Sequence, residues 1–215
     1  MRGRSSTISE ADRTAIVASY SERLAKHGVA EQTRNPGRGN RRRVQHEVHA
    51  SVGDLRGKTV LDLGCGLATF YAYLKAQGIH VRYVGYDIVE PFIASNRARF
   101  PEASFKLSDV SCDPITDRAG FAILCQVFNN RYAAANNDEV VKHLTAKAFA
   151  AVSTAVSLDL RTNYVSYEEP GLYYYSPEEM FSFAKSLTPF VKLRHDYLPY
   201  DFTLTLFKEA TMRWR

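Results

Sequence analysis

Cysteine is scarce in this 215-residue sequence, which contains only Cys65, Cys112 and Cys125. Their number is odd and no two form a CxxC pair, so neither a disulfide framework nor a zinc site is indicated. We expect buried, reduced thiols and no bound metal. The sequence also lacks any run of about 18 or more apolar residues, and its first residues lack the apolar stretch of a secretory signal. These absences predict a cytoplasmic protein without a membrane span.

The composition is that of an ordinary globular protein. Apolar residues make up 45% of the chain and charged residues 24%, which excludes disordered and fibrous classes. A chain of this length can build one α/β domain with a well-buried core, with little room for a second. We therefore expect a single domain in which residues 59–215 form the core and residues 1–58 form an N-terminal helical leader.

Positive charge is concentrated in that leader. Residues 1–58 contain 12 of the 28 Lys and Arg but 6 of the 23 Asp and Glu, so the leader carries the whole excess of the +5 net charge. Its densest part, Arg34–Arg43, either attracts nucleic acid or an acidic substrate or is a solvated loop. Helices are predicted on either side, over residues 11–26 and 43–52. The first has one apolar face, made by Ile16, Val17, Tyr20 and Leu24.

From Thr59 onward, apolar runs alternate with helical patterns. The runs are typical of buried strands and cover residues 59–63, 81–87, 104–107, 121–127, 155–160, 191–197 and 201–207. Helices are predicted over residues 67–77, 91–99, 138–151 and 176–186. Only Leu198–Tyr200 separates the last two strands, so these must be antiparallel. The sequence predicts an α/β fold, a doubly wound, seven-stranded, mostly parallel sheet that ends in an antiparallel hairpin, with a ligand at the carboxyl ends of the first strands.

Four features of this core carry a family resemblance. The segment Val60–Gly66, VLDLGCG, resembles the first motif of class I methyltransferases that depend on S-adenosylmethionine (SAM). Asp87 and Asp109 stand where that family keeps the acids that hold the ribose hydroxyls and face the adenine amino group, and the C-terminal hairpin also matches. The resemblance covers about residues 59–207, although Ala68 replaces a glycine that the family often has. It implies the class I methyltransferase fold, with SAM as cofactor and S-adenosylhomocysteine (SAH) as product.

The resemblance also implies which residues contact the cofactor. In the core these are Asp62, Gly64, Cys65, Gly66, Asp87, Ile88, Asp109, Val110 and Gln126. The glycines allow a close approach to the methionine part, the following helix N-terminus favours its carboxylate, and the Gln126 side chain faces the amino group. We expect the leader to close over the cofactor as a lid, with Tyr20 and Arg43 reaching it.

Candidate catalytic and substrate residues follow the fourth, fifth and sixth strands. Methyl transfer is an in-line displacement, so positioning dominates, and a base is required only if the nucleophile arrives protonated. Candidates for catalysis are His195, Asn129 and Tyr164. The segment 161–175 is too long for a simple connector, and its tyrosine faces suit an amine or a planar ring. Candidates for substrate binding are Asn130, Asn163, Tyr167, Tyr173 and Tyr174.

Three functions remain open at this point. A small-molecule methyltransferase acting on N or O, for example on a natural-product or secondary-metabolite intermediate, is favoured. The alternatives are an RNA or protein methyltransferase that uses the arginine-rich segment, and a non-catalytic SAM-binding module. No RNA-binding domain is appended, and Gln126–Tyr132 lacks the [DN]PP[YF] sequence of methyltransferases acting on nucleobase amines and glutamine amides. A dehydrogenase is disfavoured because Thr69 stands where its third glycine belongs. The sequence leaves monomer and homodimer equally open.

Overall fold

Seven strands form one sheet in the computed structural model, which describes residues 7–34 and 36–211. The strands are β1 (Thr59–Leu63), β2 (Arg82–Asp87), β3 (Ser104–Leu107), β4 (Ala119–Leu124), β5 (Val152–Arg161), β6 (Val191–Leu198) and β7 (Asp201–Phe207). Their order in the sheet is β3-β2-β1-β4-β5-β7-β6, and β7 runs antiparallel to both of its neighbours whereas the other pairs are parallel. The predicted doubly wound sheet and its C-terminal hairpin are confirmed.

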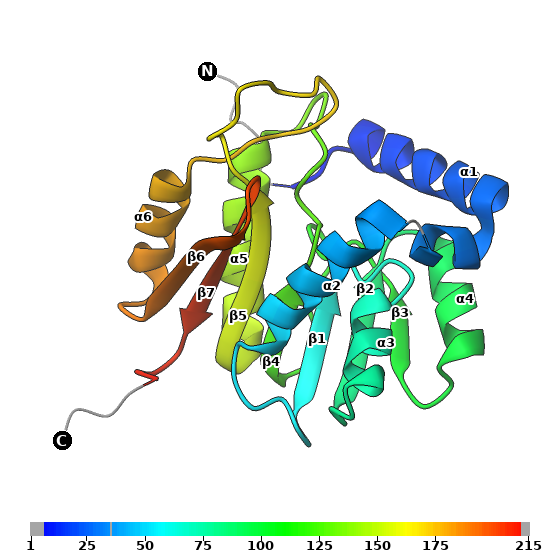
Figure 1. The fold of residues 1–215 in the computed structure, drawn as a ribbon, viewed down its shortest axis with the longest axis horizontal. Helices are drawn as coiled ribbons and strands as arrows, with labels where there is room; N and C mark the ends of the chain where they lie inside the picture. Colours follow the sequence, from blue (N-terminus) through cyan, green and yellow to red (C-terminus); the bar gives the residue numbers. More distant parts are fainter. Residues whose placement is uncertain (1–6, 35, 212–215) are drawn as a thin grey trace.

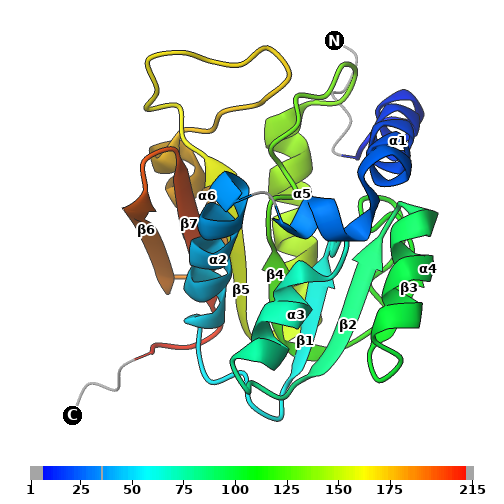
Figure 2. The ribbon, with the colours of Figure 1, turned by 45° about the vertical axis from the view of Figure 1, so that its right-hand side comes forward.

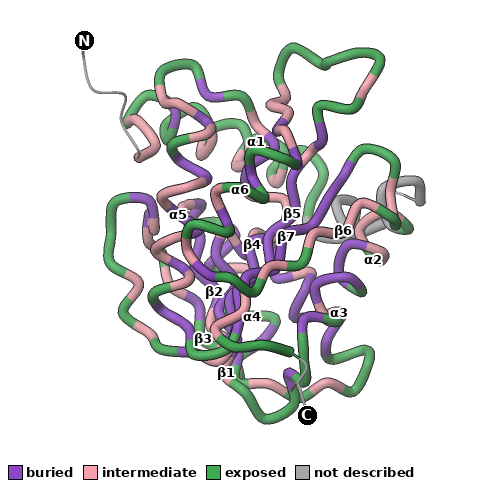
Figure 3. The backbone as a smooth tube through the Cα atoms, turned by 90° about the vertical axis from the view of Figure 1, so that its left-hand side faces the viewer, coloured by how far each residue is buried: buried purple, intermediate pink, exposed green. Residues whose placement is uncertain are grey.

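Helices cover both faces of the sheet (Figures 1 and 2). One face carries α2 (Pro36–Ala50), α3 (Thr69–Ala76) and α4 (Glu90–Arg99), and the other carries α5 (Asn137–Ala151) and α6 (Pro177–Leu187). Two helix starts follow from local chemistry, because the side chains of Asn136 and Ser176 accept hydrogen bonds from the first free N–H groups of α5 and α6. The central strands β1, β4 and β5 are buried on both sides, as Figure 3 shows.

The leader helices are longer than the sequence pattern predicts. Helix α1 (Glu10–Arg34) continues through Gly28, where a φ of 62° and a ψ of 174° kink it. Helix α2 begins at Pro36, so the expectation of a loop over Arg34–Arg43 is wrong. The segment has no apolar periodicity to reveal a helix, yet arginine favours helices and proline is tolerated in a first turn. The side chains of residues 29–39 lie outside the described part of the structure.

The two leader helices pack differently. On α1, the predicted apolar face is confirmed, since Val17, Tyr20 and Leu24 pack against Leu67, Val89 and Phe92 at the carboxyl edge of the sheet. Helix α2 is part of the core, and its Val48 and His49 are 7% and 0% exposed.

The structure also bears on the cysteines and on the expectation of no membrane span. All three cysteines are free, but Cys112 is exposed, so the expectation that each is buried is wrong. Among the helices of the described residues, none combines the length and apolar character that crossing a membrane requires.

Candidate functional site

The turn after β1 is shaped by its glycines. Gly64 and Gly66 have φ angles of 80° and 51°, which residues with side chains rarely adopt. The N–H groups of Gly64 and Cys65 both donate to the carbonyl oxygen of Tyr86, at 2.8 and 2.9 Å. A Cβ atom at Gly64 would lie 2.8 Å from Val127 Cγ2, whereas one at Gly66 would meet nothing within 4 Å. Gly64 therefore permits close packing, and Gly66 faces open space.

Asp87 ends β2 directly beside this turn. Its Oδ2 accepts a hydrogen bond from the Gly66 N–H at 2.8 Å and its Oδ1 one from the Val89 N–H at 2.9 Å. Burial raises the pKa of Asp87, and these backbone hydrogen bonds offset part of the increase. Each oxygen keeps a lone pair for a further donor.

Asp109 lies after β3, and one of its oxygens is left unpaired. Its Oδ1 accepts hydrogen bonds from the N–H and the hydroxyl of Ser111, at 3.0 and 2.6 Å. Its Oδ2 is buried without a hydrogen-bond partner, and the nearest cation, Nη1 of Arg13, lies 4.0 Å away. A buried carboxylate oxygen of this kind is costly unless a ligand supplies a donor.

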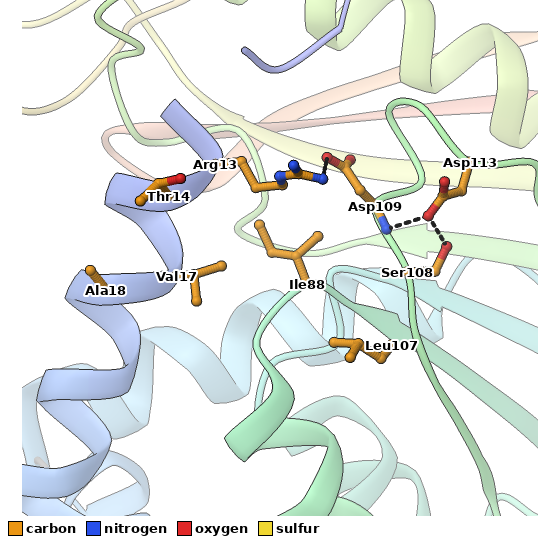
Figure 4. Close-up of a pocket in the computed structure, with 9 residues that line it drawn as sticks. All are labelled: Arg13, Thr14, Val17, Ala18, Ile88, Leu107, Ser108, Asp109 and Asp113. Atoms are coloured by element: carbon orange, nitrogen blue, oxygen red, sulfur yellow. Dashed lines mark hydrogen bonds and ion pairs between the residues drawn. The ribbon is translucent and has the colours of Figure 1, made fainter. Parts of the chain in front are cut away.

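A cavity of about 530 Å³ lies between α1 and the ends of β2 and β3 (Figure 4). Helix α1 lines it with Arg13, Thr14, Val17 and Ala18, and the core lines it with Ile88, Leu107, Ser108, Asp109 and Asp113. Apolar walls beside acidic groups suit a flat ring that carries N–H donors. The fold thus brings Ile88 and Asp109, far apart in the sequence, to one cavity. Val110 is absent from the lining.

Helix α1 is fixed over the cavity by Asp12. The carboxylate of Asp12 accepts hydrogen bonds from the N–H groups of Ala133, Ala134 and Ala135, at distances of 2.7 to 3.3 Å. It also accepts one from the hydroxyl of Ser9 at 2.7 Å. Burial raises the pKa of Asp12, but these hydrogen bonds outweigh burial and hold the pKa below its ordinary value. A charged clamp therefore joins α1 to the segment after β4.

The turn after β4 contains the next group of predicted residues. Gln126 has a φ of 61°, and both its N–H and its side-chain amide donate to Asp159. Asn129 Nδ2 donates to Gln126 Oε1 at 2.8 Å, while Asn129 Oδ1 is buried without a partner. Asn130 Nδ2 lies 3.4 Å from the Tyr20 hydroxyl, which connects this turn to α1. The Gln126 side chain thus points to Asp159 and Asn129.

The tyrosine-rich segment does not converge into one box. Tyr164 and Tyr167 are 63% and 70% exposed. Tyr173 donates to Asp138 at 2.7 Å and the Tyr174 hydroxyl accepts from the Glu169 N–H at 3.0 Å, so both are used within the framework. Asn163 is exposed and its N–H donates to the carbonyl of Tyr175.

Two predicted residues lie away from the glycine turn. Arg43 is on the outer side of α2, where its 62% exposed side chain pairs with Glu47 at 3.4 Å, a position that does not fit cofactor binding. His195 is on the edge strand β6, four strand positions from β1, which is about 19 Å at the usual spacing of strands. Its ring lies 6.4 Å from that of Tyr164 and 6.1 Å from that of Phe202.

Several residues that sequence reasoning did not single out surround the site. Asp12 and Arg13 lie on α1, and His49 and Asp159 are fully buried beneath the turn after β4. His49, Cys125 and Asp159 also place one ligand atom each within 4.8 Å of one another. These residues are more than 30 positions apart, so no local motif could reveal the group.

Comparison with known proteins agrees with the geometry. No family model matches the chain. A protein of Mycobacterium tuberculosis named as a methyltransferase is 29% identical over 159 residues, which cover 71% of this chain and 94% of that protein. The fold of this chain is that of class I methyltransferases.

Several solved structures of methyltransferases share the fold. Magnesium protoporphyrin IX methyltransferase from Synechocystis, solved with SAH, aligns with a TM-score of 0.64 at 14% identity, over 92% of this chain and all of that one. Human N-acetylserotonin methyltransferase, solved with SAM, aligns with a TM-score of 0.65 at 17% identity, over 94% of this chain and 60% of that one. SAM or SAH is thus the ligand bound in both of these structures. The unpaired oxygen of Asp109 and the open space at Gly66 fit such a ligand.

Proposed function

We propose that this protein is a methyltransferase that transfers the methyl group of SAM to a nitrogen or oxygen atom of a small molecule. The observation that carries the proposal is the way that segments of the chain border the carboxyl edge of β1 and β4. Helix α1 is clamped to the segment after β4 through Asp12, and that segment pairs with the long segment after β5 through a bridge between Asn130 and Leu172. A recess bordered by the chain's own segments suits a small acceptor better than a folded macromolecule.

In this proposal the glycine turn, Asp87 and the residues of the cavity each contact a different part of the cofactor. Gly64–Gly66 receive the methionine part and Asp87 the ribose hydroxyls. Asp109 Oδ2 takes a hydrogen bond from the adenine amino group, with Ile88 on one side of the ring and Val17 of α1 on the other. SAM supplies an electrophilic methyl group when bound. What the chain contributes is orientation and exclusion of water, which are the main requirements of an in-line transfer.

Asn129 is the best placed residue to meet the acceptor. Its unpaired Oδ1 can accept a hydrogen bond from an N–H or O–H group, and the adjacent Val127 packs on the glycine turn. A neutral amide carbonyl orients such a nucleophile but does not remove its proton. The similarity to methyltransferases named for magnesium protoporphyrin IX and N-acetylserotonin supports a small acceptor.

The arginine-rich segment gives little support to an RNA substrate. Arg41 donates two hydrogen bonds to the buried Asp201, at 2.9 and 2.5 Å, and Arg43 is paired with Glu47. Both guanidinium groups are thus used within the protein, which leaves less charge for phosphates.

The test combines binding and turnover. SAH should bind one-to-one in calorimetry, and Asp109→Ala should weaken it because the adenine contact is removed, whereas Asp54→Ala, at an exposed position outside the cavity, should change it little. Tritiated SAM should label small amines or phenols in a panel of acceptors, and bulk RNA should not shift in a gel. Labelling of RNA or protein, with no small acceptor labelled, would refute the proposed substrate class.

A further inference from the structure

A buried chain of polar groups links α2 to the turn after β4. His49 Nδ1 lies 2.8 Å from the Ser157 hydroxyl, and His49 Nε2 lies 3.4 Å from Asp159 Oδ1. Asp159 in turn accepts two hydrogen bonds from Gln126, one from the backbone N–H at 2.6 Å and one from the side-chain amide. All of His49, Ser157 and Asp159 are 0% exposed.

Gln126 needs such support because of its backbone. A φ of 61° is the left-handed conformation, which is unfavourable for a residue with a Cβ atom. One carboxylate holds both the main chain and the side chain of Gln126. The next residue, Val127, is the one that packs on Gly64. The position of Asp159 therefore decides how the turn sits against the glycine turn.

Asp159 also determines which way the side-chain amide groups of Gln126 and Asn129 face. Burial raises the pKa of Asp159, but His49 and the Gln126 donors outweigh burial and hold the pKa below its ordinary value. A carboxylate only accepts hydrogen bonds, so the NH₂ group of Gln126 must face it. Gln126 Oε1 then accepts from Asn129 Nδ2, which leaves Asn129 Oδ1 as the free acceptor at the end of the chain.

We propose that Asp159, supported by His49, is a positioning residue that holds Gln126 in the left-handed conformation and so orients Val127 and Asn129 at the SAM site. The proposal rests on placing SAM at the glycine turn. Cys125 completes the group of ligand atoms within 4.8 Å, but burial raises the pKa of its thiol, which disfavours the thiolate that a metal ion would require. We therefore assign this group to positioning and not to a metal.

The test is a double-mutant cycle of Asp159→Asn and Gln126→Gly on the full chain. D159N should weaken SAH binding about tenfold in the parent protein, because one hydrogen bond to Gln126 is lost or reversed. In the Q126G protein it should change binding by less than about threefold, because glycine adopts this φ without support. Asp201→Asn is the matched control. Asp201 is also a buried carboxylate that accepts from α2, through Arg41 and Gln45, but it has no hydrogen bond to the turn.

Two results would overturn the proposal. One is a loss of SAH affinity from D159N that is equal in the parent and in the Q126G protein. The control D201N should behave in this way, because Asp201 has no hydrogen bond to the turn. The other comes from hydrogen exchange of residues 122–130, which does not require the protein to bind SAH: D159N should accelerate exchange in the parent but not in Q126G. Equal acceleration would contradict positioning even if the SAM assignment itself were wrong. If D159N does not fold, His49→Gln, which loosens the same carboxylate, takes its place in the cycle.

Discussion

The Gly66 N–H donates to Oδ2 of Asp87 at 2.8 Å, and this hydrogen bond joins the turn after β1 to the end of β2. Strands β1 and β2 run parallel and pair as far as Leu63 and Tyr86, so the segments that follow them meet at the carboxyl edge of the sheet. Asp87 therefore shapes the glycine turn in addition to the ribose contact that we propose. The two roles predict that the loss of Asp87 weakens SAH binding and also destabilises the glycine turn in the absence of ligand.

Asp87→Ala should weaken SAH binding by about 1.5–3 kcal/mol, the range for a hydrogen bond to a charged group. Calorimetry at fixed pH measures the affinity, and thermal unfolding without ligand measures the effect on the turn. Asp54→Ala, at an exposed position before β1, is the control and should change neither. An unchanged affinity for the D87A protein would remove Asp87 from the ribose site.

Gly64→Ala should be more harmful than Gly66→Ala. Both glycines have positive φ, which costs a residue with a Cβ atom about 1–2 kcal/mol, but only at Gly64 would the new atom lie 2.8 Å from Val127 Cγ2. The overlap should add about 1–3 kcal/mol to the loss in the free energy of unfolding. Urea denaturation of the two variants tests this difference. Val127→Ala combined with G64A should recover part of the extra loss, and no recovery would mean that the overlap is relieved in another way.

The fold was largely predictable from the sequence, because each step rests on neighbouring residues. Buried strands such as Thr59–Leu63 are continuous apolar runs, and the short link at residues 199–200 makes β6 and β7 antiparallel. The start of α2 was not predictable in this way. The residues from Pro36 to Arg43 contain no apolar residue, so their helix has no periodic pattern.

The site was predictable only where it depends on local motifs. The glycine turn and Asp87 lie within one βαβ unit, so their spacing along the chain reflects their distance in space. Asp12 and Asp159 contact residues 121 and 33 positions away, and such pairs leave no signal in a single sequence. The distance of His195 from the glycine turn was not predictable for the same reason, since it depends on the order of the strands.

The stability of the protein should depend on the protonation of Asp62. Burial raises the pKa of Asp62 to about 7, partly opposed by the hydrogen bond from Tyr83 and the charge of His49, while Asp87 raises it further. The pKa of Asp62 is higher in the folded state than in the unfolded state. Its contribution to the free energy of unfolding is therefore fully present below about pH 4 and is lost as the pH rises through about 7.

Asp62→Asn should remove this pH dependence, because an amide does not titrate. Urea denaturation at pH 5 and pH 8 should show a smaller loss of stability for D62N than for the parent, by a few kcal/mol at most. Asp117→Asn, which removes a partly exposed carboxylate paired with Lys106, is the control and should keep the parent's loss between these two pH values. Identical pH dependence in D62N and the parent would assign the titration to another group.

The lid role of α1 depends on Asp12, whose carboxylate gathers three backbone N–H groups from residues 133–135. Asp12→Ala removes charge-assisted hydrogen bonds worth about 1.5–3 kcal/mol between α1 and residues 133–135. Helix α1 should then detach without global unfolding, because α2 and not α1 is built into the core. Trypsin should cleave the D12A protein faster at Arg23 and Lys26, and SAH should bind more weakly, because Arg13 and Val17 of α1 line the cavity.

Glu22→Ala, at an exposed position of the same helix, is the matched control and should digest like the parent. SAH should slow cleavage in the parent and less so in D12A, since a bound ligand holds the lid closed. Cleavage at equal rates in D12A and the parent, with no protection by SAH in either, would show that α1 does not act as a lid.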